Sequence, residues 1–83
     1  MPAVLKLYVK TWCPWCVTAK RDLDKRGFFY EEIDVERDSA AYRKMIRLSG
    51  QPLTPTLVAG NHVLPDFGPE ELEFFLKKHS IEP

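Results

Sequence analysis

A small α/β fold, with helices covering the faces of one sheet, is the class that this 83-residue sequence predicts. The chain has room for one domain, residues 1–83, because at this size the buried surface only just offsets the entropy of folding. Apolar residues make up 45% of the chain, which favours a packed core over disorder. Segments with strand character alternate with helical segments before a final hairpin and helix, an order typical of an α/β sheet.

The first two predicted elements lead into the cysteines of the chain and follow them. Residues 3–9 form a short run rich in Val, Leu and Tyr, which predicts a buried strand. Residues 14–26 show a helical pattern, and Pro14 is favoured in a first helical turn, where its missing N–H costs nothing. Gly27 supplies the stop. One face of this helix is expected to carry Cys16, Ala19, Lys20 and Leu23.

A second strand and a second helix come next. Residues 28–35 form the strand, and the two glutamates at 31–32 make it less apolar than the first, which indicates an edge position. Asp38 or Ser39 is suited to cap a helix that reaches about Ser49, where a glycine follows and ends it. The expected core face of this helix comprises Tyr42, Met45 and Ile46.

A hairpin and a last helix complete the predicted fold. Residues 56–59 and 62–64 are short apolar segments joined by Gly60-Asn61, a pair that tolerates positive φ and predicts a turn. Gly68-Pro69 then opens a helix whose acidic first turn and basic last turn suit the helix dipole. The charged residues are Glu70, Glu71, Lys77, Lys78 and His79, and the inner face comprises Leu72, Phe75 and Leu76.

Charge and composition argue against several classes of function. Lys plus Arg and Asp plus Glu number 12 each, so no net charge attracts nucleic acid or an anionic membrane. No apolar run is long enough to span a bilayer. Residues 1–10 lack the pattern of a secretory signal, and the cytoplasm is the expected location. Two cysteines are too few for the disulfide framework of a small secreted domain, which favours a reactive or metal-binding pair.

Both cysteines and both tryptophans of the chain fall within Thr11-Trp12-Cys13-Pro14-Trp15-Cys16. Cysteines at positions i and i+3 of a first helical turn project on one side, close enough for their sulfurs to bond. Such a disulfide closes almost no loop and therefore adds little stability. The spacing indicates a reversible bond that serves redox chemistry.

The position of each cysteine predicts a different role. Cys13 precedes the helix, where free N–H groups and the positive end of the dipole stabilise a thiolate. Lys10 adds a positive charge that stabilises the same thiolate and can meet an anionic substrate. Cys16 lies a turn inward and is expected to be more buried and protonated. Cys13 then attacks a substrate disulfide, and Cys16 attacks Cys13 to release the reduced product.

Other interpretations of these residues stay open. A lone CxxC is also half of a zinc site, but zinc needs about four ligands, and His62 and His79 do not have finger spacing. No metal site is expected, and both histidines are predicted to be surface residues. Trp12 and Trp15 form an apolar rim for a thiol substrate or simply pack on the fold.

The sequence resembles the dithiol glutaredoxins over nearly its whole length. The resemblance is carried by the Cys13-Pro14-Trp15-Cys16 centre, by Lys10 three residues before it, and by the later Thr54-Pro55. Residues 49–55, Ser-Gly-Gln-Pro-Leu-Thr-Pro, align with a family segment of the type Thr-Gly-Gln-Arg-Thr-Val-Pro. The resemblance implies a thioredoxin-like fold, with a four-stranded mixed sheet flanked by three helices. It also implies a monomeric oxidoreductase that reduces disulfide-containing proteins, uses glutathione as reductant and binds no other cofactor.

The same resemblance assigns a glutathione site. Pro55 is expected to be cis and to face the cysteines, while the backbone of Thr54 pairs with the glutathione cysteine. Gln51 matches the family position that contacts the glycine carboxylate. Asp66 has no such match in the family pattern, and its acidic side chain is expected to pair with the substrate's amino group. The complete set of expected glutathione-binding residues is Lys10, Trp15, Gln51, Thr54, Pro55 and Asp66.

Two departures from the family pattern bear on this site. Pro52 stands where glutaredoxins carry an Arg or a similar residue. Leu64-Pro65 replaces the Gly-Gly pair that lets the backbone approach the γ-glutamyl carboxylate of glutathione, and the backbone of Asp66 or Gly68 replaces that contact only in part. We therefore expect weaker glutathione binding than in typical members.

The resemblance also leaves two alternatives for function. Glutaredoxin-like electron donors of ribonucleotide reductase keep the fold and the CxxC but draw electrons from thioredoxin reductase and bind glutathione poorly. Other glutaredoxins carry an iron-sulfur cluster between two subunits, commonly through a monothiol Cys-Gly-Phe-Ser centre. Lys10 and the Pro-aromatic pair favour the dithiol reductase over the first alternative, and Pro14 with the second thiol disfavours the carrier.

Overall fold

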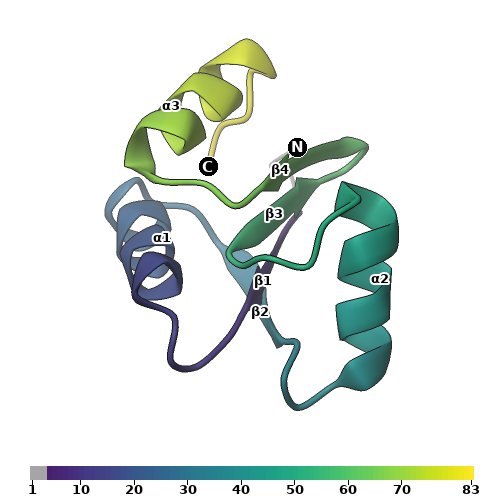
Figure 1. Cartoon of the computed structure of the whole chain (residues 1–83). Helices are drawn as coiled ribbons and strands as arrows, with labels where there is room; N and C mark the ends of the chain where they lie inside the picture. The colour runs from purple at the N-terminus through teal and green to yellow at the C-terminus, as the bar shows by residue number, and fades with distance from the viewer. Residues whose placement is uncertain (1–3) are drawn as a thin grey trace.

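The computed structural model describes residues 4–83, which form one four-stranded mixed sheet and three helices (Figure 1). The strands lie in the order β2-β1-β3-β4, with β1 and β2 parallel and the other neighbours antiparallel. The predicted α/β class and the edge position of the second strand are confirmed. The elements are β1 (Leu5–Val9), α1 (Pro14–Lys25), β2 (Tyr30–Asp34), α2 (Ser39–Ser49), β3 (Thr56–Ala59), β4 (His62–Pro65) and α3 (Pro69–Lys78).

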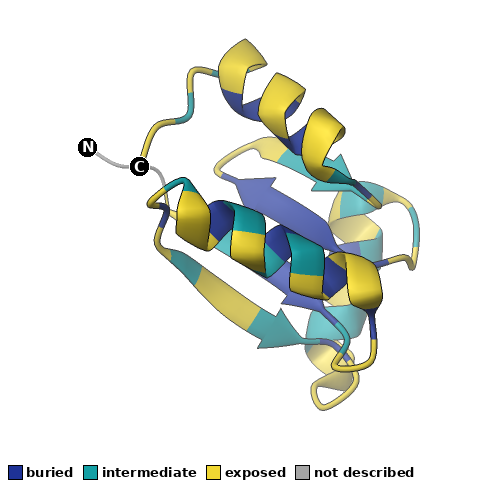
Figure 2. Ribbon diagram, turned by 90° about the vertical axis from the view of Figure 1, so that its left-hand side faces the viewer, coloured by how far each residue is buried: buried dark blue, intermediate teal, exposed yellow. Residues whose placement is uncertain are grey.

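The sheet separates two cores of unequal size. Helices α1 and α3 cover one face, and α2 covers the other (Figure 1). Side chains alternate along β1, so Leu5, Leu7 and Val9 enter the larger core under α1 and α3, whereas Tyr8 enters the smaller core under α2. Both central strands are buried, while the outer surfaces of the helices are exposed (Figure 2). Both cysteines belong to the larger core.

Helix α1 begins where the sequence predicts, and Cys13 is its N-cap, followed by Pro14. The buried residues of the helix are Cys16, Ala19 and Leu23, as expected. Lys20, expected on the same face as these residues, is half-buried, and its ammonium pairs with Glu32 at 3.3 Å. Its long side chain keeps the charge near water at the border of the buried face.

Helix α2 has the predicted cap and stop. The side chain of Asp38 accepts a hydrogen bond from the N–H of Ala41 at 3.1 Å, and Gly50 ends the helix with a positive φ of 74°. Met45 is its buried residue, while Tyr42 and Ile46, also expected on the core face, are half-buried. The smaller core is therefore closed by a helix that is less deeply embedded than α1.

The hairpin and the last helix also follow the prediction. Gly60 has a positive φ of 61°, which its missing side chain permits, and β3 and β4 pair on either side of it. Helix α3 begins at Pro69 and buries Leu72, Phe75 and Leu76, the expected inner face. The second strand is shorter than expected, Tyr30–Asp34 instead of 28–35, and residue 3 of the first predicted strand lies outside the described residues. Within residues 4–83 no helix has the length and apolarity needed to cross a membrane.

Candidate redox site

Cys13 lies at the point where the chain turns from β1 into α1. Its sulfur accepts a hydrogen bond from the backbone N–H of Cys16 at 3.2 Å, and its thiol lies 3.7 Å from the carbonyl oxygen of Thr54, to which it donates. Only 6% of the residue is exposed. An N–H at the start of a helix that points at the sulfur is the geometry that stabilises a thiolate. The position therefore suits a nucleophile.

Cys16 occupies the next helical turn and is 1% exposed. Burial raises its pKa to about 11, with further contributions from the hydrogen bond and charge of Cys13, while hydrogen bonds from Thr54 and the backbone of Lys10 act in the opposite direction. Both cysteines are free thiols in this structure. The expectation that Cys16 is the more buried thiol is confirmed, and its raised pKa agrees with the resolving role predicted for it.

The Thr54-Pro55 bond is cis, as the resemblance implies. Its residues bring a second part of the chain to the cysteines, because the Thr54 carbonyl faces Cys13 and the Pro55 carbonyl accepts the N–H of Asp66 at 2.8 Å. Thr54 and Pro55 are both buried. Of the expected glutathione-binding residues, Thr54 therefore lies beside the candidate nucleophile, Pro55 follows it in the chain, and Asp66 adjoins Pro55.

Lys10 has aromatic neighbours. Its Nζ lies 5.6 Å from the centroid of the Trp12 ring and 5.9 Å from that of Tyr42, within the range of a cation–π contact. Its carbonyl oxygen accepts the N–H of Cys13 at 3.3 Å. The backbone of Lys10 therefore supports the cysteine loop, whereas the action of its charge on the Cys13 thiolate stays a prediction.

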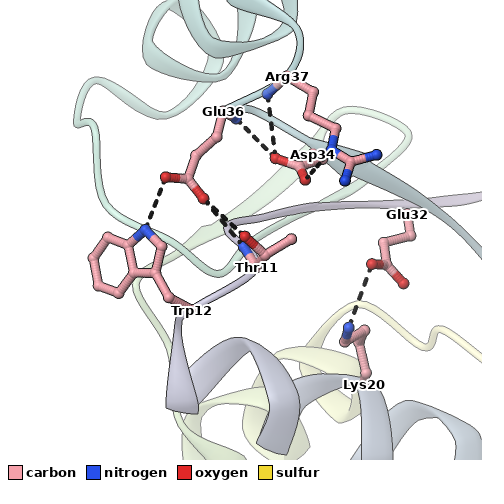
Figure 3. Close-up of polar contacts among 7 residues, drawn as sticks. All are labelled: Thr11, Trp12, Lys20, Glu32, Asp34, Glu36 and Arg37. Atoms are coloured by element: carbon pink, nitrogen blue, oxygen red, sulfur yellow. Dashed lines mark hydrogen bonds and ion pairs between the residues drawn. The ribbon is translucent and has the colours of Figure 1, made fainter.

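Glu36, in the turn between β2 and α2, was not among the residues predicted for the site. Its Oε2 accepts a hydrogen bond from Trp12 Nε1 at 2.8 Å, and its Oε1 accepts from the Thr11 N–H at 3.3 Å and the Thr11 hydroxyl at 3.2 Å (Figure 3). The turn is itself held by Asp34, whose carboxylate accepts the backbone N–H of Glu36 at 2.9 Å. The signal available in the sequence was an acidic residue just beyond a strand predicted to lie in the same sheet as the cysteine-bearing segment.

Trp15 and Asp66 line an open groove beside the start of α3. The groove has a volume of about 410 Å³. The Trp15 ring lies against Gly68, since a Cβ at that position would be 3.5 Å from its Cζ3. Asp66 adopts a positive φ of 47°, a conformation that aspartate tolerates better than most residues. The other lining residues are Phe67, Pro69, Glu70 and Glu71, so the groove carries acidic side chains and an aromatic wall.

Gln51 has a structural task that the resemblance did not indicate. Its side-chain oxygen accepts the N–H of Leu53 at 2.7 Å, and its amide nitrogen donates to Ser49 Oγ at 3.0 Å and Thr56 Oγ1 at 3.1 Å. These bonds span the loop that ends in the cis peptide bond. Because the amide is occupied within the chain, Gln51 must exchange some of these bonds to contact a glutathione carboxylate.

The two histidines pack against each other at the far end of α3. The rings of His62 and His79 are stacked with their centroids 3.8 Å apart, and Phe75 meets His79 edge-on at 4.8 Å. Partial burial and the neighbouring charge of His62 lower the pKa of His79. Both were predicted to be surface residues; His62 is exposed and His79 is half-buried, and their stacking was not predicted. In the described part of the chain, no group of three or more His, Cys, Asp and Glu side chains could hold a metal ion.

Comparison with known proteins places this arrangement in a family. Residues 5–64 match the family model described as Glutaredoxin, a region that contains both cysteines and the cis proline. The chain belongs to the glutaredoxin family. It is 31% identical over 55 residues to Glutaredoxin 3 of Escherichia coli strain K12, covering 66% of this chain and 66% of that protein, just under two thirds of its length.

Solved structures related to this glutaredoxin agree with the assignment. The thioredoxin-like protein BC3987 is 33% identical, with a TM-score of 0.79 over 87% of this chain and 99% of that one. The glutaredoxin-like protein NrdH-redoxin from Escherichia coli is 28% identical, with a TM-score of 0.73 over 86% and 92% of the two chains. The protein is thus a redox protein of the glutaredoxin family with a thioredoxin-like fold.

Proposed function

We propose that the chain is a cytoplasmic dithiol oxidoreductase that reduces protein disulfides and glutathione mixed disulfides. The observation that carries the proposal is the unequal environment of its two thiols. Cys13 caps a helix and accepts the N–H of Cys16 at 3.2 Å, whereas Cys16 is 1% exposed and has a pKa raised by burial to about 11. A stabilised nucleophile beside a buried thiol is the arrangement that two-step disulfide exchange requires.

The reaction proceeds through a mixed disulfide. The Cys13 thiolate attacks one sulfur of the substrate disulfide, and the other substrate sulfur leaves as a thiolate that takes up a proton. Cys16 then loses its proton and attacks the Cys13 sulfur, which releases the second substrate thiol and leaves a Cys13–Cys16 disulfide. The substrate gains two electrons and two protons, and two glutathione molecules restore the dithiol while forming glutathione disulfide.

Residues around the cysteines support the binding of glutathione. The Thr54 backbone lies beside Cys13, where it can pair with the cysteine of a bound tripeptide, and cis Pro55 adjoins it. Lys10 supplies a positive charge for a carboxylate. Trp15 and Asp66 line the same groove, and the Asp66 carboxylate supplies a negative charge suited to the γ-glutamyl amino group.

A second candidate is an electron donor to ribonucleotide reductase that is recharged by thioredoxin reductase. Three carboxylates, Asp66, Glu70 and Glu71, line the groove, and glutathione carries a net negative charge that they repel. Leu64-Pro65 replaces the glycine pair, and the Gln51 amide is occupied within the chain. The related NrdH-redoxin from Escherichia coli is described as having a thioredoxin-like activity profile.

An assay of the re-reduction of the oxidised protein distinguishes the two candidate functions. The oxidised chain is mixed with a disulfide substrate and NADPH, together with either glutathione and glutathione reductase or thioredoxin reductase, and NADPH consumption is followed. Cys13→Ser is the control in both assays. Turnover with glutathione supports the first proposal. Turnover with thioredoxin reductase alone supports the second, which a ribonucleotide reductase assay then checks. Turnover with neither system rejects both.

A further inference from the structure

The loop that carries the nucleophile is tied to a distant turn by one carboxylate. Glu36 accepts three hydrogen bonds, from the indole N–H of Trp12 at 2.8 Å and from the N–H and hydroxyl of Thr11 at 3.3 and 3.2 Å (Figure 3). The parallel pairing of β1 with β2 explains why Glu36 reaches Thr11 and Trp12. Val9 lies opposite Asp34, and because the strands run in the same direction, Thr11 and Trp12 leave the sheet at the same end as Glu36. Glu36 therefore joins the end of β1 to the turn before α2.

These bonds orient Trp12 without burying it. The residue remains 68% exposed, yet its indole nitrogen is fixed by Glu36 and the Lys10 ammonium lies 5.6 Å from the ring centroid. An exposed tryptophan has the freedom to adopt several rotamers, and each added restraint removes some of them. The contacts hold a broad apolar surface in one orientation on the residue that directly precedes Cys13.

The low exposure of Cys13 makes the Trp12 ring a contact surface for incoming substrates. Because only 6% of Cys13 is exposed, a substrate disulfide must approach along the side chains that border it, and Trp12 is its neighbour in sequence. Tryptophan offers a large contact area at a small entropic cost when it is already held in place. A polypeptide substrate can lie across this ring, whereas a small disulfide has no chain that reaches it.

We propose that Glu36 is a positioning residue that holds Trp12 as a contact surface for polypeptide disulfide substrates. The inference rests on the proposed disulfide reductase activity and adds a substrate preference to it. Glu36 acts through Trp12 and Thr11 and takes no part in the exchange of sulfur atoms. Its loss should therefore weaken the binding of polypeptide substrates more than it slows attack on small disulfides.

The test compares Glu36→Ala and Glu36→Gln with the wild type. Glu32→Ala is the matched control, because Glu32 also carries an exposed carboxylate on the β2 side of the molecule but pairs with Lys20 at 3.3 Å and not with the cysteine loop. Pre-reduced protein is mixed with a synthetic peptide loop closed by one disulfide, or with bis(2-hydroxyethyl) disulfide, and the half-saturating concentration and limiting rate are measured. Circular dichroism verifies the fold of each variant.

For Glu36→Ala we expect the half-saturating peptide concentration to rise about fivefold, on the scale of one or two exposed hydrogen bonds to a charged group. The limiting rate and the reaction of the small disulfide should stay close to those of Glu32→Ala. For Glu36→Gln the half-saturating peptide concentration should lie between those of Glu36→Ala and Glu32→Ala, because the amide oxygen can still accept a hydrogen bond from Trp12. In a Trp15→Phe background, where Trp12 is the remaining tryptophan of the chain, its fluorescence anisotropy should fall on loss of Glu36.

Several results would overturn the inference while leaving the proposed function intact. One is an equal loss for peptide and small disulfide, which would mean that Glu36 acts on the whole loop. Another is a half-saturating peptide concentration of Glu36→Ala equal to that of Glu32→Ala, whether or not the Trp12 anisotropy falls. If the wild type reduces neither substrate, the proposed function itself is wrong, and the inference is rejected with it.

Discussion

The two halves of the segment 11–16 are held by different forces. Thr11, Trp12 and Cys13 are held by hydrogen bonds, to the Glu36 carboxylate and the Thr54 carbonyl. Trp15 and Cys16 depend more on packing, since Trp15 lies against Gly68 and Cys16, at 1% exposed, is the more deeply buried of the two cysteines in the larger core. Polar contacts to the Cys16 N–H and the Thr54 carbonyl orient the outer sulfur, whereas burial raises the pKa of the inner one. One short motif thereby gives the proposed nucleophile and the proposed resolving thiol different surroundings.

Replacing Cys13, the outer thiol, should have the largest effect and tests most directly the division of roles between the two halves of the segment 11–16. Cys13→Ser should abolish exchange with every disulfide, a loss of roughly a thousandfold or more, because an alcohol cannot replace the thiolate as attacking group. The rate of substrate reduction by the pre-reduced variant is the measurement. Retained activity would transfer the nucleophilic role to Cys16 and invalidate the comparison.

The protonation of the inner thiol gives the next largest effect. Burial raises the Cys16 pKa from an ordinary value of 9.0 to about 11, so below pH 9 its thiolate is about a hundredfold scarcer than that of an ordinary cysteine. The alkylation rate of Cys16 should keep rising with pH toward about 11, and in urea-unfolded protein it should level off at lower pH. Brief iodoacetamide pulses with site-resolved mass spectrometry follow both profiles. Coincident profiles would show that burial does not hold the proton.

Replacing the inner thiol should separate two reactions. In Cys16→Ser the mixed disulfide of Cys13 with a protein has no internal thiol to resolve it, so protein disulfide reduction should fall by at least about tenfold. Reduction of glutathione mixed disulfides should persist, because a second glutathione resolves that adduct. Parallel turnover assays decide the point, and an equal loss in both would contradict a purely resolving role.

Removing the charge of Lys10 should have the smallest effect of these changes. Lys10→Met removes the ammonium but keeps most of the side-chain length, and alkylation of Cys13 at neutral pH should slow about two- to fivefold, because the charge is partly exposed and screened. Lys10→Arg should restore the rate, and Lys44→Met on the exposed surface of α2 is the control. A rate unchanged in Lys10→Met would confine the role of Lys10 to its backbone contact with Cys13 and its packing on Trp12.

The residues alone were enough to predict most of the fold. Helix caps such as Asp38, the positive-φ turn at Gly60 and the inner face of α3 depend on contacts a few residues apart, and the structure confirms all three. The unequal burial of Cys13 and Cys16 follows equally from helix periodicity. The cis bond at Pro55 was predicted through family resemblance, since local patterns do not distinguish it from an ordinary proline.

The remaining features of the site depend on contacts between distant segments. Glu36 lies 25 residues from Thr11, and its role appears only once β1 and β2 pair in parallel with Val9 opposite Asp34. The internal bonds of Gln51 and the stacking of His62 on His79 likewise depend on how a loop closes and how α3 sits beside β4. Hydrogen bonds and ring contacts act over a few ångströms in space, so short-range sequence patterns identify the groups able to make them, and strand register determines which partners they meet.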